Sequence, residues 1–193
     1  MPANPRPATL SVYQHGGIEM RKIILLLAAA FALAGCVSKY KPIATEAPAS
    51  MLSSGASFYV MQPADGRYGS NSYPGSGEQT AVAVQSALIP RAGRVIRAQR
   101  PEELEAALST AREKNLDYVL QTRILNWEDR ATEWSGIPDK LSLNFEIYDA
   151  ATGERVASQT SKASSKWATF GGDHPQDLLP LPIGEFMKTV FGS

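Results

Sequence analysis

The chain has 193 residues with 19 basic and 19 acidic side chains, so its formal net charge at pH 7 is zero. This balance argues against a nucleic-acid binder, because such proteins usually carry a basic excess. The chain has one cysteine, Cys36, which excludes a disulfide framework within the chain and a two-cysteine redox motif.

The N-terminal region predicts an export signal. Met20 is followed by Arg21 and Lys22, and then by an uncharged apolar stretch over residues 23–34. A membrane span needs about 20 apolar residues, so this shorter stretch is typical of a secretory signal. Residues 20–35 are therefore predicted to be a signal peptide. Residues 1–19 do not look like targeting sequence, and we expect them to be an extension upstream of the natural start.

A motif at the end of this signal predicts lipid attachment. The residues Leu33-Ala34-Gly35-Cys36 resemble the lipobox of bacterial lipoproteins. The resemblance implies cleavage before Cys36, a covalent lipid on its thiol and an acylated (palmitate-type) new N-terminus. The protein would then bind the membrane through its acyl chains. In such lipoproteins an aspartate after the cysteine favours the inner membrane, so Val37 implies the outer membrane, with the domain facing the periplasm.

The rest of the chain predicts one globular domain behind a linker. Residues 36–55 contain Ser, Lys, Pro and Ala without apolar periodicity, and are predicted to be a flexible, lipid-anchored tether. Residues 56–193 are predicted to form a single α/β (α+β) domain. Its expected order is β-α-β-α-β-β-β-α, with helices packed on a mixed sheet of about five strands.

The predicted elements follow from periodicity and from turn residues. The strands are expected at residues 57–62, 94–97, 117–127, 140–149 and 155–166, the last near an edge of the sheet. The helices are expected at residues 77–89, at 101–114 after Pro101, and near the C-terminus, where Ile183, Phe186, Met187 and Val190 form an apolar stripe.

The clearest strand is Lys140–Asp149. Leu141, Leu143, Phe145 and Ile147 alternate with polar residues, which predicts one buried face and one wetter face, as in antiparallel sheets. The following residues 149–153 predict a tight hairpin, in which Gly153 can take a positive φ.

Strand directions alone predict where a functional site would lie. The strand 117–127 ends where the strand 140–149 begins, and the strand 155–166 returns to the same end. If the first strand runs parallel to 117–127, the loop after residue 62 joins them at the end where open α/β sheets place ligands. The candidate binding surface at this loop end consists of Trp127, Asp129, Arg130, Glu133, Trp134, Trp167, Asp173 and His174.

Three interpretations of this loop end stay open. The tryptophans can simply cap the core. They can instead anchor a binding surface, since Trp and Arg are common at interfaces, and Trp can also stack on the sugars of peptidoglycan. Thirdly, Glu133 and Asp173 could form a carboxylate pair, or His174 could act as a general base. We expect no metal site and no cofactor other than the lipid, because only one histidine follows the signal.

Two stretches carry a resemblance to a known family. They are residues 125–136 (LNWEDRATEWSG) and 166–180 (KWATFGGDHPQDLLP). Together with the lipobox and the hairpin at 149–154, they resemble proteobacterial outer-membrane lipoproteins of domain-of-unknown-function family 4823. The resemblance implies an envelope location and no particular activity.

The sequence thus favours a lipid-anchored outer-membrane lipoprotein whose domain binds an envelope protein or peptidoglycan, without enzymatic activity. The alternative is an envelope hydrolase that acts on cell-wall material through the carboxylates of the loop end.

Overall fold

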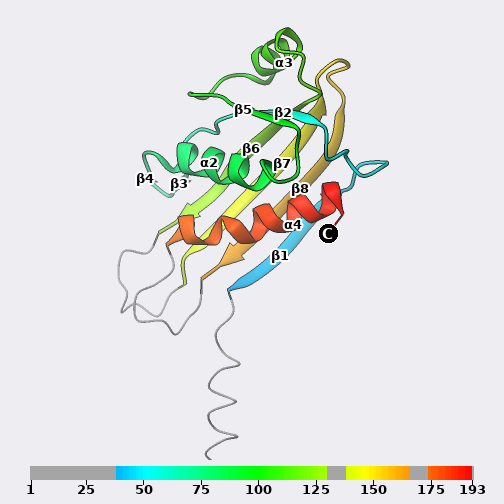
Figure 1. The fold of residues 1–193 in the computed structure, drawn as a ribbon. Coiled ribbons are helices and arrows are strands. Elements are labelled where there is room, and N and C mark those ends of the chain that lie inside the picture. Colours follow the sequence, from blue (N-terminus) through cyan, green and yellow to red (C-terminus); the bar gives the residue numbers. More distant parts are fainter. Residues whose placement is uncertain (1–37, 130–137, 166–173, 193) are drawn as a thin grey trace, which may run out of the picture. The chain divides into compact units, whose positions relative to one another are not determined.

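A six-stranded sheet forms the centre of the domain, in the order β1-β8-β7-β6-β2-β5 (Figure 1). The computed structural model describes residues 38–129, 138–165 and 174–192. β2 runs parallel to both β5 and β6, and the other pairs are antiparallel. The mixed sheet and the α/β class predicted from the sequence are confirmed. The strands are β1 (Lys39–Glu46), β2 (Ser57–Val60), β5 (Arg94–Arg97), β6 (Tyr118–Glu128), β7 (Lys140–Asp149) and β8 (Arg155–Ser164).

Helices cover the two faces of the sheet unequally. On one face α2 (Ser76–Leu88) and α4 (Pro180–Phe191) pack over the core. The short helix η1 (Pro175–Leu178) comes directly before α4. On the other face α3 (Leu104–Glu113) packs against β2 and the start of β6. A short hairpin, β3 (Arg67–Tyr68) and β4 (Asn71–Ser72), lies outside the sheet. Within the described part of the chain, no helix is long and apolar enough to cross a membrane.

β7 shows why the sheet has two unlike faces. Leu141, Leu143, Phe145 and Ile147 are at most 1% exposed and belong to the core beneath α2 and α4. The ring of Phe145 stacks on that of Phe186 from α4, with 4.9 Å between centroids. The polar residues between them point to the opposite side, which over β7, β8 and β1 carries no described helix. We call this side of these three strands, and of the neighbouring end of β6, the open face.

The predicted tether is wrong for residues 39–46. These residues form β1, which pairs antiparallel with β8 in a register that places Tyr40 opposite Ala163. The strand arises because β8 offers a long edge of backbone groups, and the phenol of Tyr40 also accepts a hydrogen bond from Gln159 Nε2 at 2.9 Å. Pro42, which has no N–H to donate, is tolerated because β1 is itself an edge strand with a bulge after this residue.

β8 lies near an edge of the sheet, as its mostly polar side chains predicted. The unexpected β1 is the edge strand itself, so β8 lies between β7 and β1. Its core-facing residues are small or polar, such as Ala157, Gln159 and Ser161, and they are buried. The hairpin before it is as predicted, with Gly153 at a φ of 76°. The upstream extension, the signal peptide and Cys36 lie outside the described residues.

Candidate functional site

The strand ends meet as predicted at the loop end of the sheet. The register places Glu128, Lys140 and Ser164 side by side on β6, β7 and β8. The segment after β2 joins them, since Gly66 lies so close to Trp127 that an added Cβ would be 2.5 Å from the Cβ of the tryptophan. Any larger residue at position 66 would have to displace this backbone, so the glycine allows the close approach.

Trp127 is part of the core rather than of a surface. Its side chain is only 2% exposed and lies in the cluster that α2 and α4 cover. For this tryptophan the core-capping interpretation is therefore confirmed, and its predicted place in an exposed binding surface is wrong. A large flat ring at the end of β6 is buried here because the Gly66 segment covers it. Arg130, Glu133, Trp134, Trp167 and Asp173 lie outside the described residues.

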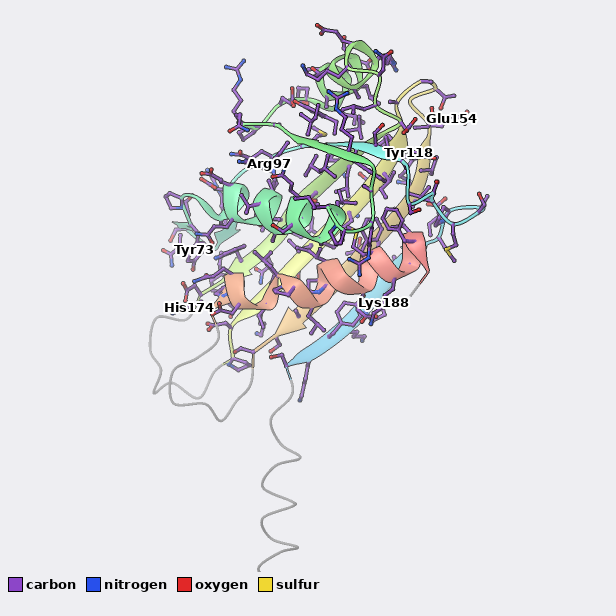
Figure 2. The ribbon with its side chains drawn as sticks, in the orientation of Figure 1. Tyr73, Arg97, Tyr118, Glu154, His174 and Lys188 are labelled. Atoms are coloured by element: carbon purple, nitrogen blue, oxygen red, sulfur yellow. The ribbon has the colours of Figure 1, made fainter. Side chains whose placement is uncertain are left out.

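Asp129 and His174 do come together at the loop end, on the side marked by the His174 label in Figure 2. His174 Nδ1 lies 3.3 Å from Asp129 Oδ1, and their side chains are 56% and 28% exposed. This hydrogen bond raises the pKa of His174 above its ordinary value. The phenol of Tyr73 donates to the Asp129 carbonyl at 3.4 Å, and the His174 N–H donates to Asp177 Oδ2 at 3.0 Å. Both members of the pair are thus held from a second side.

Asp139 is a third polar residue of this group, which the sequence reasoning missed. It is 6% exposed, and its backbone exchanges hydrogen bonds with Ser165: its N–H donates to Ser165 Oγ at 2.9 Å, and its carbonyl accepts from Ser165 N–H at 3.0 Å. Its place at the start of β7, opposite the end of β6, was the available signal. One ligand atom each of Asp129, Asp139 and His174 lie within 4.8 Å of one another. Carboxylate oxygens and an imidazole nitrogen are ligand types of divalent cations.

The other acids near this end serve structural contacts. Glu128 is 3% exposed, and its Oε2 lies 3.7 Å from Lys140 Nζ. Asp65 Oδ1 accepts the N–H of Gly77 at 2.9 Å in the first turn of α2.

A hollow lies at the carboxyl end of β2. It has a volume of about 580 Å³ and is lined by Met61, Asp65, Glu102 and Arg123, among others. Glu102 Oε1 accepts a hydrogen bond of 2.7 Å from the phenol of Tyr59. Burial, together with this acceptor, raises the pKa of Tyr59 to about 12. Glu102 and Tyr59 thus bind each other at this hollow, and their hydrogen bond supports the fold.

The chain belongs to the family described as Domain of unknown function (DUF4823), whose family model matches residues 50–190. This confirms the resemblance found in the sequence. No curated protein matches the chain.

Solved structures similar to this chain exist. A PelC dodecamer from Paraburkholderia phytofirmans is 16% identical, with a TM-score of 0.58 over 81% of this chain and 99% of that chain. A PelC variant from the same organism gives 0.60 over 81% and 100%, also at 16% identity. A Xanthomonas campestris protein of the family DUF330 is 15% identical, with a TM-score of 0.43 over 71% and 83%. At these identities the PelC likeness shows the shared fold.

Proposed function

We propose that the protein is a non-enzymatic lipoprotein, anchored to the outer membrane through Cys36, whose α/β domain binds an envelope protein at the loop end of the sheet. The observation that carries this proposal is the Asp129–His174 pair. It is partly exposed, held by Tyr73 and Asp177, and set beside strand ends that a buried tryptophan and Gly66 fix in place. Binding sites need such polar groups on rigid supports.

The location rests on the sequence. The basic start, the short apolar stretch and the lipobox at Cys36 support lipid attachment, and Val37 supports the outer membrane over the inner one. Membership of DUF4823 agrees with this assignment, because the resemblance to that family also implied an envelope lipoprotein. The shared fold with PelC, which crystallised as a dodecamer, makes further copies of the same chain one class of partner to test.

One observation favours the alternative of an envelope hydrolase. A histidine oriented by an aspartate is the arrangement of a general base, and His174 Nδ1 contacts Asp129 in this way. Two other acids near this end, Glu128 and Asp65, contact Lys140 and the Gly77 N–H respectively. The carboxylate pair of Glu133 and Asp173, which a glycosidase would need, lies outside the described residues.

Photo-crosslinking in intact envelopes tests the binding function. A photoreactive residue at Gln176, which is exposed in η1, should crosslink to one defined protein, whereas one at Thr152, in the hairpin at the other end of the sheet, should not. His174→Ala should abolish the crosslink from position 176. A crosslink from both positions, or none from either, would contradict a binding surface at the loop end.

The same variant separates the alternative. If the protein is a hydrolase, His174→Ala should abolish release of soluble fragments from purified peptidoglycan, and the wild-type protein should show that activity. Binding to intact peptidoglycan without release would indicate a cell-wall ligand in place of a protein partner. Fractionation of Cys36→Ala tests the anchor separately, because this variant has no thiol to accept the lipid.

A further inference from the structure

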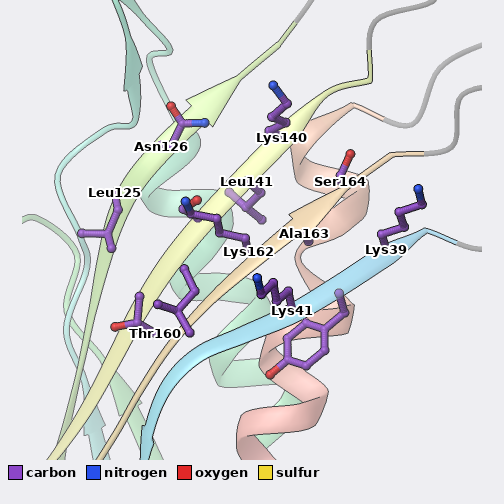
Figure 3. Close-up of a pocket in the computed structure, with 13 residues that line it drawn as sticks. Lys39, Lys41, Leu125, Asn126, Lys140, Leu141, Thr160, Lys162, Ala163 and Ser164 are labelled. Carbon is purple, nitrogen blue, oxygen red and sulfur yellow. The ribbon is translucent and has the colours of Figure 1, made fainter.

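A groove of about 690 Å³ lies on the open face, across the ends of β1, β8, β7 and β6 (Figure 3). Four lysines line it: Lys39 and Lys41 from β1, Lys162 from β8 and Lys140 from β7. Among the residues that the structure describes, the lining contains no aspartate, glutamate, histidine or cysteine. The described lining therefore has no carboxylate and no imidazole, and its formal charge at neutral pH is entirely positive.

This positive charge is not balanced within the described part of the domain. Lys140 has Glu128 as a partner at 3.7 Å, but no described carboxylate lies within 4 Å of the ammonium groups of Lys39, Lys41 or Lys162. Lys41 and Lys162 are also direct cross-strand neighbours in the register of β1 and β8. Like charges placed opposite one another weaken a sheet, so the fold itself gains nothing from this pair, and an anion from outside would relieve it.

The groove also has an apolar component. Ile43, at the bulge of β1, is 51% exposed, and Leu125, at the irregular step of β6, is 55% exposed. Both side chains line the groove. Lysines beside exposed aliphatic residues suit the boundary between lipid headgroups and acyl chains, where ammonium groups meet phosphates and apolar side chains leave water.

The groove lies close in sequence to the proposed lipid anchor. Lys39, the first residue of β1, follows Cys36 by three residues. A fully extended chain spans at most about 3.6 Å per residue, so these residues reach no further than about 11 Å. A lipid on Cys36 would thus hold the lysine end of the open face next to the membrane surface. That distance is about one Debye length at 0.1 M salt, within which charges still attract.

We propose that the lysine groove binds phosphate groups of anionic phospholipids in the membrane that anchors the protein, so that the open face docks onto the bilayer. The inference rests on the lipid anchor proposed for Cys36. It adds a second, electrostatic contact to the acyl chains and assigns the open face to lipid, while the loop-end pair of Asp129 and His174 is assigned to the protein partner.

Lysine labelling of the reconstituted protein tests this inference. The purified lipidated protein is inserted into vesicles of phosphatidylcholine alone, or of phosphatidylcholine with about one third phosphatidylglycerol. An amine-reactive reagent is added, and modification is quantified by mass spectrometry. A lysine near an anionic surface gains about 1 kcal/mol, which corresponds to about five-fold. We expect at least this protection of Lys39, Lys41 and Lys162 in anionic vesicles, and its loss in about 1 M salt, where the Debye length is about 3 Å.

A matched pair of variants gives the control. Lys41→Gln with Lys162→Gln should remove most of the protection of Lys39 without lowering the melting temperature. Lys114→Gln with Lys188→Gln makes the same charge change on α4 and at the end of α3, and should leave the protection unchanged.

Each other outcome overturns the inference. Equal protection in neutral vesicles would show that the anchor alone shields the lysines. Protection by inorganic phosphate in neutral vesicles would indicate a site for a free anion. If the N-terminal peptide carries the acyl mass but the lysines are not protected, the anchor stands and the proposed lipid binding by the groove is contradicted. Absence of the acyl mass would contradict the anchor, and the inference would fail with it.

Discussion

The two halves of the open face carry charge in opposite ways. Near the hairpin, the carboxylate of Glu146 on β7 binds Arg123 of β6 and Arg155 of β8, and Arg155 also binds Glu46 of β1 at 3.0 Å. Near the loop end, the lysine groove has an excess of positive charge. The same four strands thus hold a balanced charge network at one end and an unbalanced groove at the other. The difference suggests that the first stabilises the fold and the second serves an external anion.

Removing the charge of Glu146 should have the largest effect on stability. The side chain of Glu146 is 8% exposed and accepts hydrogen bonds from Arg155 Nη1 at 2.9 Å and from the phenol of Tyr148 at 3.0 Å. Glu146→Gln would leave Arg123 without its carboxylate partner and Arg155 with Glu46 alone. We expect the free energy of unfolding to fall by about 2 kcal/mol, measured by urea denaturation. An unchanged urea midpoint would mean that the charge network around Glu146 contributes no more stability than a surface ion pair.

Protonation of Glu146 at low pH should lower the stability in the same way as Glu146→Gln. Burial alone would raise the pKa of Glu146, but hydrogen bonds from Tyr148 and Arg155 and the charge of Arg123 outweigh it, so its pKa lies below the ordinary value. A carboxyl group with a lowered folded pKa contributes stability above its unfolded pKa of about 4.3, and loses it as the pH falls through the folded value. Below about pH 4, wild type and Glu146→Gln should therefore converge in unfolding free energy. A difference that stays constant as the pH falls would assign the stability to something other than this charge.

The lysine half should respond weakly and with the opposite sign. Lys41→Gln with Lys162→Gln removes a cross-strand repulsion, so we expect the unfolding free energy to stay constant or to rise by up to about 0.5 kcal/mol. Urea denaturation of the unlipidated and lipidated forms checks this. A clear loss of stability would show that these lysines support the fold, and the contrast between the two halves would disappear.

The smallest effect concerns the Asp129–His174 pair. Its hydrogen bond raises the pKa of His174, so the pair contributes fully below the unfolded pKa of about 6.5 and its contribution is lost as the pH rises through the folded value. Asp129→Asn should lower the pKa of His174 toward its ordinary value, as measured by NMR titration of the imidazole. The effect on stability should be slight, because the histidine is more than half exposed. No change in the pKa would mean that the two side chains do not pair in solution.

Local pattern was enough to predict most of the secondary structure. The alternation of β7 and the stripe of α4 report which side of each element is buried, and the observed β2, β5, β6 and β8 differ from the predicted strands by two residues at most at either end. Strand directions were also enough to place the loop end. These signals succeed because periodicity and connection lengths act within a short stretch of chain.

The missed features depend on partners far away in the sequence. β1 has a weak pattern of its own and exists through pairing with residues 158–164, more than 100 positions later. The position of Trp127 at the loop end was predicted correctly, but its exposure was not. Its burial depends on Gly66, which lies next to it only in the folded chain. Asp139 joined the site through the register of β7 with β6. The lysine groove likewise combines β1 with three other strands, so it could not be predicted while residues 36–55 were expected to be a tether.

The placement of β1 at the edge of the sheet has a mechanical consequence. If Cys36 is lipidated, any tension between the membrane and the domain enters through Lys39, at the end of a strand held by β8 alone. A partner pulling at the loop end would peel β1 from β8 one backbone hydrogen bond at a time, which needs little force. A partner pulling at the hairpin would load the same bonds together in shear, which resists far more. The end of the sheet at which a partner binds would therefore decide whether this domain yields under tension or transmits it.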